Sequence, residues 1–183
     1  MPRGCFIETF KNILKTKNIR SLNFFEIIMN ILDKRACGVL MHISSLPGNF
    51  GIGTLGKNAY KFVDFLKKSS QTYWQILPIC PTSYGDSPYQ SFSTFAGNPY
   101  FIDFELLEEQ GLIAKQDYQN IVWANAETEV DYGILYTKRH ELFKKIQNNF
   151  EKNIPPAFYE FCSENAFWLE NYSLFMAIKD FPL

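Results

Sequence analysis

Two short apolar runs with one helix-length segment between them limit the folds open to this chain more than any other feature. The first run is Gly-Val-Leu-Met-His-Ile at residues 38–43, and the second covers residues 72–79, where Tyr73 and Trp74 favour extended backbone. Residues 57–70 lie between them and carry apolar side chains at helical spacing. This order predicts a βαβ unit with two parallel strands and a right-handed crossover, the first strand buried on both faces.

The sequence after residue 103 is predicted to be helical. Asp103 is suited to cap a short helix that ends at Gly111, a long helix is expected over residues 134–150, and one or two further helices over residues 157–178. The 134–150 helix is expected to turn four apolar side chains inward, namely Leu135, Leu142, Phe143 and Ile146. It is expected to turn four cationic side chains outward, namely Lys138, Arg139, Lys144 and Lys145. Two strands alone do not make a stable sheet, so a βαβ unit followed by helices indicates the opening of a larger α/β domain.

The loops that leave the carboxyl ends of parallel strands carry function in α/β folds. In this chain they are residues 44–55 and 80–101. The first loop contains Gly48, Gly51 and Gly53, but it lacks the residue order of a phosphate-binding loop. Its glycines are therefore expected to serve tight turns and close backbone approach.

The second loop combines rigid aromatic rings with hydroxyls, an amide and several prolines. Tyr84, Tyr89 and Tyr100 are interleaved with serines and glycines. Such a mixture suits a polyhydroxylated ligand, because rings stack on its apolar faces while hydroxyls and amides exchange hydrogen bonds with it. A packed surface loop without a ligand is the alternative. Asp86 and Gln90 are expected to hold the loop through side-chain-to-backbone hydrogen bonds.

Composition narrows the classes of partner and cofactor. A net charge of −1 and a pI of about 6.1 give no electrostatic footprint for nucleic acid or an anionic membrane. No apolar run approaches the ~18–20 residues of a membrane span. Two histidines and four cysteines without a C-x-x-C pair provide no metal-ligand cluster, and the cysteines are expected to be buried, reduced thiols of a cytoplasmic protein. Residues 1–34 are predicted to form a helical extension of unclear role, and a plastid is the alternative location if they act as a transit peptide.

Residues 39–103 resemble the amino-terminal part of the 4-alpha-glucanotransferases called amylomaltases or disproportionating enzymes, which form glycoside hydrolase family 77. Weaker similarity continues to Ala177, and residues 1–34 have no clear counterpart. The resemblance is carried by five ordered segments, namely Gly38–His42, Ser44–Gly48, Phe50–Gly53, Trp74–Pro78 and Tyr84–Tyr100.

This resemblance implies the amino-terminal portion of a (β/α)8 TIM barrel with a helical insertion subdomain. Residues 35–103 would be the first βαβ unit with its substrate loop, and residues 104–183 the inserted helices. About two barrel strands would be present, at residues 38–43 and 73–79.

The resemblance also implies an activity without a metal or organic cofactor. Family members transfer a segment of an alpha-1,4-glucan to the 4-hydroxyl of another sugar by a retaining double displacement with two carboxyl groups. Carried over residue by residue, Tyr89 would contact the glucan in the cleft, Ser87 would supply a hydroxyl beside it, and Tyr84 would bind glucan outside the catalytic centre. His42 is expected either to reach the cleft or to be a satisfied core histidine.

No catalytic residue is assigned, because the family's three catalytic acids would follow on later strands. The isolated 183-residue chain is therefore expected to be inactive. Two alternatives remain: a non-catalytic, glucan-binding remnant of the same family, and an alpha-glucan hydrolase of the same clan. The sequence specifies neither the oligomeric state nor the preferred glucan.

Overall fold

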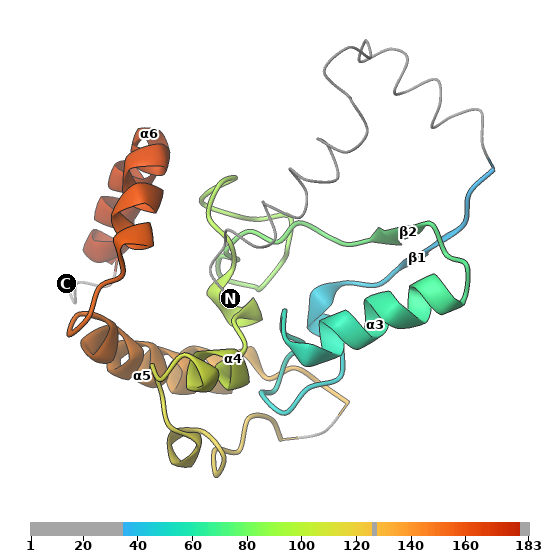
Figure 1. Cartoon of the computed structure of the whole chain (residues 1–183), viewed down its shortest axis with the longest axis horizontal. Coiled ribbons are helices and arrows are strands. Elements are labelled where there is room, and N and C mark those ends of the chain that lie inside the picture. The colour runs from blue at the N-terminus through green and yellow to red at the C-terminus, as the bar shows by residue number, and fades with distance from the viewer. Residues whose placement is uncertain (1–34, 126–127, 180–183) are drawn as a thin grey trace.

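A computed structural model of the chain describes residues 35–125 and 128–179. The helical extension predicted for residues 1–34 lies outside the described residues, as does Cys5. The described part is a mixed α/β structure in which one parallel strand pair is followed by helices (Figure 1).

The predicted βαβ unit is confirmed, with shorter strands than expected. Strand β1 (Gly38–Leu40) and strand β2 (Tyr73–Gln75) pair in parallel, with Gly38 opposite Tyr73 and Leu40 opposite Gln75. Helix α3 (Lys57–Lys68) connects them. Beyond β1, the backbone N–H of Met41 still donates to the carbonyl of Gln75 at 3.0 Å.

The sheet is less buried than the sequence analysis predicted. Leu40 is 61% exposed, so β1 is not covered on both faces within the described residues. Helix α3 buries Ala59 and Leu66 and packs Phe62 against the core, while Tyr60 and Val63 face outward.

The loop after β1 folds back tightly through its glycines, as predicted. It contains the 3-10 helix η2 (Ile43–Ser45), and the N–H of Gly53 donates to the carbonyl of Ser44 at 3.0 Å. A Cβ atom at Gly53 would lie 1.9 Å from the carbonyl oxygen of Ile43. Gly51 has φ of +70°, in the left-handed region that favours glycine.

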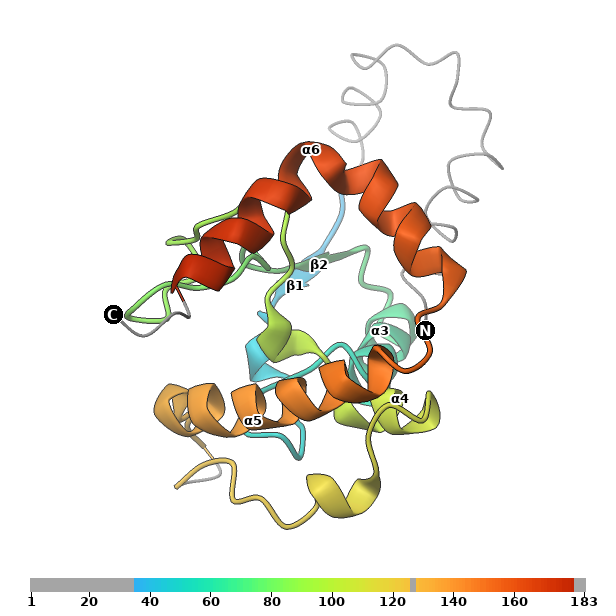
Figure 2. The same cartoon turned by 90° about the vertical axis from the view of Figure 1, so that its left-hand side faces the viewer.

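The helical part begins where the second loop ends. The 3-10 helix η3 (Pro99–Phe101) leads into α4 (Phe104–Glu109), and Gly111 follows α4 with φ of +72°, as predicted for its end. The 3-10 helix η4 (Lys115–Asp117) precedes the two long helices, α5 (Tyr132–Phe150) and α6 (Pro156–Lys179). Figure 2 shows α5 below the strands and α6 above them.

The hydrophobic core lies between the first loop, α4 and α5 rather than on the sheet. Its centre is a group of rings in which Phe50 and Phe104 meet edge to face at 5.3 Å, and Phe104 stacks on Trp123 at 5.6 Å. Leu135 and Leu142 of α5 complete it, as predicted. The βαβ unit and the helices therefore share one core.

Arg139 contradicts the prediction that the cations of α5 face outward. Its side chain is 0% exposed, and its guanidinium lies over the ring of Phe104, with 4.4 Å between Cζ and the ring centroid. The aromatic rings of the core supply a favourable face for this cation.

The three described cysteines are free thiols, but they are not buried as expected. Cys37 is exposed, while Cys80 and Cys162 are half-buried. The Sγ of Cys37 contacts the carbonyl of Ser70 at 3.8 Å, and that of Cys80 contacts the carbonyl of Thr94 at 3.7 Å.

Helix α6 is apolar on all sides and poorly covered within the described residues. It packs on the second loop through Phe95, whose ring meets that of Phe167 edge to face at 5.2 Å and stacks on Trp168 at 5.9 Å. Even so, Phe167 is 70% exposed. A helix that is hydrophobic all round is typical of an interior position in a larger domain.

The close approach at Gly53 predicts a specific loss of stability. We expect Gly53→Ala to lower the free energy of unfolding by about 1–3 kcal/mol, because the new methyl group overlaps the Ile43 carbonyl. Gly97→Ala is the matched control, since its Cβ would meet nothing within 4 Å. Urea unfolding of both variants measures the difference, and equal stabilities would contradict the prediction.

Candidate functional site

The candidate site is the loop over residues 80–101, which folds as a closed hairpin-like unit. Thr82 and Ser91 form an isolated antiparallel bridge, and the N–H of Ser83 donates to the carbonyl of Gln90 at 3.0 Å. At the base, the N–H of Asn98 donates to the carbonyl of Ile79 at 2.8 Å. These bonds close the two ends of the loop onto each other.

The tip of the loop turns through two residues with positive φ. Gly85 has φ of +93° and Asp86 has φ of +55°, and the N–H of Asp86 donates to the carbonyl of Ser83 at 3.1 Å. Aspartate tolerates the left-handed region better than most residues. Burial raises the pKa of the Asp86 carboxyl.

Serine and asparagine side chains hold the loop, rather than Asp86 and Gln90 as predicted. The Ser93 hydroxyl accepts from the N–H groups of Phe95 and Ala96 at 3.2 and 3.1 Å, and the Asn98 side chain accepts from the N–H of Tyr100 at 2.9 Å. Among the described residues, the side chains of Asp86 and Gln90 make no such backbone bond.

The structure brings the three predicted sugar-contacting residues into one turn. The hydroxyl oxygen of Ser87 accepts from the N–H of Tyr89 at 3.4 Å, and its carbonyl accepts from the N–H of Gln90 at 3.1 Å. Tyr84 is 100% exposed and Tyr89 is 74% exposed. Neither ring packs on another aromatic ring within the part of the chain that the structure describes. Both rings therefore present open faces on a backbone fixed by hydrogen bonds.

Tyr100 differs from the other two tyrosines of the loop. It is half-buried against Tyr132 of α5, with 6.0 Å between the ring centroids. Burial raises the pKa of Tyr100, and the negative charge of Asp86 raises it further. Tyr100 therefore packs the loop against α5 and offers little open surface.

His42 is a satisfied structural histidine at the end of β1. Its Nδ1 accepts from the backbone N–H of Leu77 at 3.2 Å, and its ring meets Phe101 edge to face at 5.3 Å. Burial lowers the pKa of His42. Of the two roles considered from sequence, the structure supports the core histidine.

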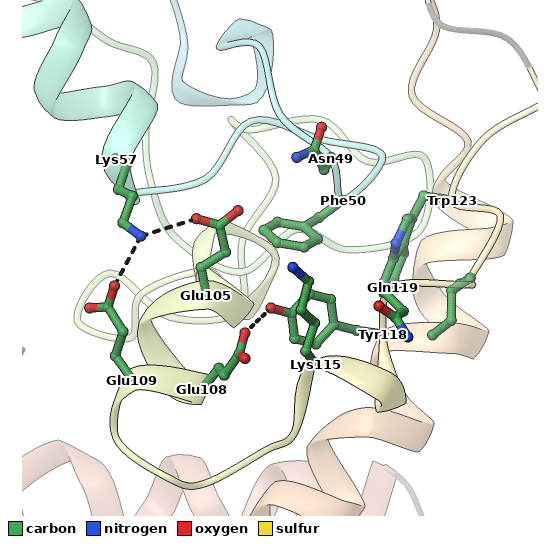
Figure 3. Close-up of a pocket in the computed structure, with 11 residues that line it drawn as sticks. Asn49, Phe50, Lys57, Glu105, Glu108, Glu109, Lys115, Tyr118, Gln119 and Trp123 are labelled. Atoms are coloured by element: carbon green, nitrogen blue, oxygen red, sulfur yellow. Dashed lines mark hydrogen bonds and ion pairs between the residues drawn. The ribbon is translucent and has the colours of Figure 1, made fainter.

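A hollow lies apart from this loop, between α3, α4 and η4 (Figure 3). It has a volume of about 730 Å³, and its acidic side chains already have partners. Lys57 pairs with Glu105 at 3.4 Å and with Glu109 at 2.9 Å, while Glu108 accepts from the hydroxyl of Tyr118. Burial and this hydrogen bond raise the pKa of Tyr118. These carboxylates serve as ion-pair and hydrogen-bond partners, and none is assigned to catalysis.

The described residues contain no group of three or more histidine, cysteine, aspartate or glutamate side chains that could hold a metal ion. Among the same residues, no helix has both the length and the apolar content to cross a membrane.

Comparison with known proteins identifies the family. The sequence profile of glycoside hydrolase family 77, described as 4-alpha-glucanotransferase, matches residues 41–182. The chain belongs to this glucanotransferase family. The match begins directly after β1 and contains strand β2, the whole candidate loop and helices α3 to α6. The resemblance read from the sequence is confirmed, and it extends further toward the carboxyl end than the motifs indicated.

Relatives of the glucanotransferase family match at high identity. The 4-alpha-glucanotransferase of Clostridium butyricum is 50% identical over 139 residues, which are 76% of this chain and 28% of that protein. The enzyme of the same name from Streptococcus pneumoniae is 50% identical over 151 residues, covering 82% and 30% of the two chains. That from Thermus thermophilus is 46% identical over 149 residues, covering 79% and 29%.

A solved glucanotransferase structure has the same fold over the shared region. The amylomaltase from Streptococcus agalactiae in complex with acarbose aligns with a TM-score of 0.76 at 51% identity, covering 80% of this chain and 30% of that one. This chain thus spans about 30% of the length of the relatives it matches.

The His42 hydrogen bond predicts a pH-dependent stability. The folded pKa is lowered from about 6.5, so the contribution of neutral His42 is present above that value and is lost as the pH falls toward the folded pKa. We expect His42→Asn, whose amide oxygen can accept the Leu77 bond without titrating, to flatten the fall in melting temperature between about pH 7.5 and 5.

The exposed histidine of α5 provides the control. His140→Asn is expected to keep the wild-type pH profile, since that side chain is exposed. Thermal unfolding at a series of pH values gives the comparison. Parallel profiles for wild type and His42→Asn would contradict the prediction, because they would show that titration of His42 does not change the stability of the fold.

Proposed function

We propose that this chain supplies the glucan-holding loop of a 4-alpha-glucanotransferase. The observation that carries the proposal is the pair of exposed rings, Tyr84 and Tyr89, on a backbone locked by its own hydrogen bonds. Tyr89 and Ser87 are the proposed contacts in the cleft, and Tyr84 the proposed contact outside the catalytic centre. The ligand is an alpha-1,4-glucan or a maltooligosaccharide.

The chemistry of the loop fits such a ligand. A glucose ring has apolar C–H faces that stack on an aromatic ring, and hydroxyls around its edge that exchange hydrogen bonds. The Ser87 hydroxyl accepts from the N–H of Tyr89, so its own proton is available to a sugar oxygen. Because the rings are already held by an ordered turn, binding orders few further groups. Acarbose, which is bound in the related streptococcal amylomaltase, is a suitable probe.

The reaction proposed for the whole protein is a retaining transfer. A carboxylate attacks the anomeric carbon of the glucan, and a carboxylic acid about 5–5.5 Å away protonates the departing 4-oxygen. The 4-hydroxyl of an acceptor sugar then attacks the covalent intermediate and gives its proton to the same acid/base residue. The proposal assigns both carboxyl groups to positions beyond these 183 residues. It needs no metal or organic cofactor.

The fold we propose for the whole protein is a (β/α)8 barrel. Strands β1 and β2 would be its first two strands, residues 35–103 its first βαβ unit, and residues 104–183 a helical insertion. The exposed Leu40 on β1 and the exposed Phe167 on α6 support this, because a larger domain would cover both. The cytoplasm is the proposed location, since the three described cysteines are free thiols and reducing compartments keep them so.

Removal of the Tyr89 ring tests the proposed site. We expect Tyr89→Ala to lower kcat/KM for maltotriose in the complete enzyme about tenfold or more, a loss of roughly 1.4 kcal/mol, because the stacking face for the glucan is gone. Tyr159→Ala is the matched control, as Tyr159 is 61% exposed on α6 and far from the loop in sequence. Unchanged kinetics in Tyr89→Ala, with the fold intact, would remove this residue from the site.

The isolated chain tests the placement of the catalytic acids. We expect the purified 183-residue chain not to disproportionate maltotriose, because retention requires a pair of carboxyl groups that we place elsewhere. Chromatography of the products measures this directly. A ladder of longer oligosaccharides would contradict the prediction, and release of glucose without such a ladder would indicate hydrolysis by the chain itself.

A further inference from the structure

Arg139 is the largest fully buried side chain of the described structure, and no carboxylate pairs with it. It extends from α5 into the aromatic core, where its Cζ lies 4.4 Å from the centroid of Phe104, 5.9 Å from that of Trp123 and 5.7 Å from that of Phe143. Burial lowers the pKa of Arg139 to about 10, so the group is still charged at neutral pH.

The hydrogen bonds of Arg139 are few for a buried guanidinium. Its Nη2 donates to the carbonyl oxygen of Ile102 at 2.5 Å, whereas Nε and Nη1 have no partner. Unpaired buried donors cost stability, and replacement of buried ionic groups by apolar ones of similar volume is often neutral or stabilising. Packing alone therefore does not account for an arginine here. Besides its contact with the Phe104 ring, the guanidinium supplies the bond to Ile102, which an apolar side chain cannot make.

That bond reaches the base of the candidate loop. Three consecutive residues there are each held by a different donor: the Phe101 carbonyl accepts from the N–H of Leu55 at 2.9 Å, the Ile102 carbonyl from Arg139, and the Asp103 carboxylate from the Thr54 hydroxyl at 2.5 Å. Two of the donors come from the first loop. Arg139 is the one that comes from α5.

We propose that Arg139 is a positioning residue for the glucan loop, fixing α5 to the base of that loop through the Ile102 carbonyl. The inference rests on the proposed function, because it takes residues 80–101 to hold the glucan. Tyr132 lies two turns earlier on the same side of α5 and packs on Tyr100, so the helix touches the loop base at two points. Without the Arg139 bond, α5 contacts the loop base through the Tyr132–Tyr100 pair alone. The direction in which the Tyr89 side chain points then becomes less defined.

Two substitutions of Arg139 separate positioning from stability. Arg139→Met keeps the length and the apolar contacts but removes the donor, while Arg139→Lys keeps a charged donor. We expect Arg139→Met to melt at or above the wild-type temperature, yet to bind acarbose about fivefold more weakly or worse, and Arg139→Lys to recover at least half of the lost affinity. Titration of the full chain with acarbose, followed by NMR, gives the affinities.

Amide hydrogen exchange provides a measurement that needs no glucan. The N–H of Phe101 donates to the Asn98 carbonyl at 3.2 Å and that of Ile102 to the Pro99 carbonyl at 3.1 Å. We expect both to exchange faster in Arg139→Met, while amides in the centre of α3 keep their wild-type rates. Exchange that does not change at Phe101 and Ile102 would overturn the proposal.

The remaining outcomes are equally decisive. Wild-type acarbose affinity in Arg139→Met would refute the positioning role, and so would a joint loss of melting temperature and affinity that Arg139→Lys fails to restore. Tyr89→Ala is titrated in parallel. If that variant binds acarbose as the wild type does, the proposed glucan site is wrong, and the exchange rates alone then decide whether Arg139 fixes the loop base.

Discussion

The rest of the structure depends on the hydrogen bonds that the carboxylate of Asp103 accepts. One oxygen accepts from the N–H groups of Glu105 and Leu106, at 3.0 and 3.3 Å, and so begins α4. The other accepts from the buried hydroxyl of Thr54 at 2.5 Å. Gly56 leaves room for this contact, because a Cβ there would lie 1.9 Å from the carboxylate. A single side chain thus joins the first loop, the end of the candidate loop and the start of the helices.

The candidate loop combines internal order with open side chains. Its backbone is closed by the bridge between Thr82 and Ser91 and by the bond from Asn98 to Ile79, while Tyr84 and Tyr89 project without ring partners among the described residues. Order of this kind lowers the entropy that a ligand must remove on binding. The same loop is fixed to the fold at its base and through the contacts of Phe95 with α6. The geometry of the candidate site therefore depends on contacts made by residues outside the turn that carries Tyr84 and Tyr89.

Local signals in the sequence predicted the local structure well. The apolar runs gave the βαβ unit, and Asp103 and Gly111 gave the ends of α4, because these features depend on neighbours a few residues away. Tyr84, Ser87 and Tyr89 lie in one short turn for the same reason.

The burial of Arg139 was not predicted, because the positive charge of an arginine favours an exposed position. The spacing indicated the opposite, since position 139 falls on the same side of α5 as Leu135, Leu142 and Ile146. The bond from Thr54 to Asp103 joins residues 49 apart, and no local pattern indicates it.

The distance between Arg139 and Ile102 along the chain has a consequence for how the protein is made. The bond joins residues 37 apart, and the donor is synthesised after the acceptor. Contacts of this separation form late, since the intervening chain must first be ordered. On the ribosome, the candidate loop leaves the exit tunnel before α5 does. For that interval the base of the loop has only the donors of the first loop, Thr54 and Leu55, and its aromatic side chains lie on the nascent chain without the contact from α5.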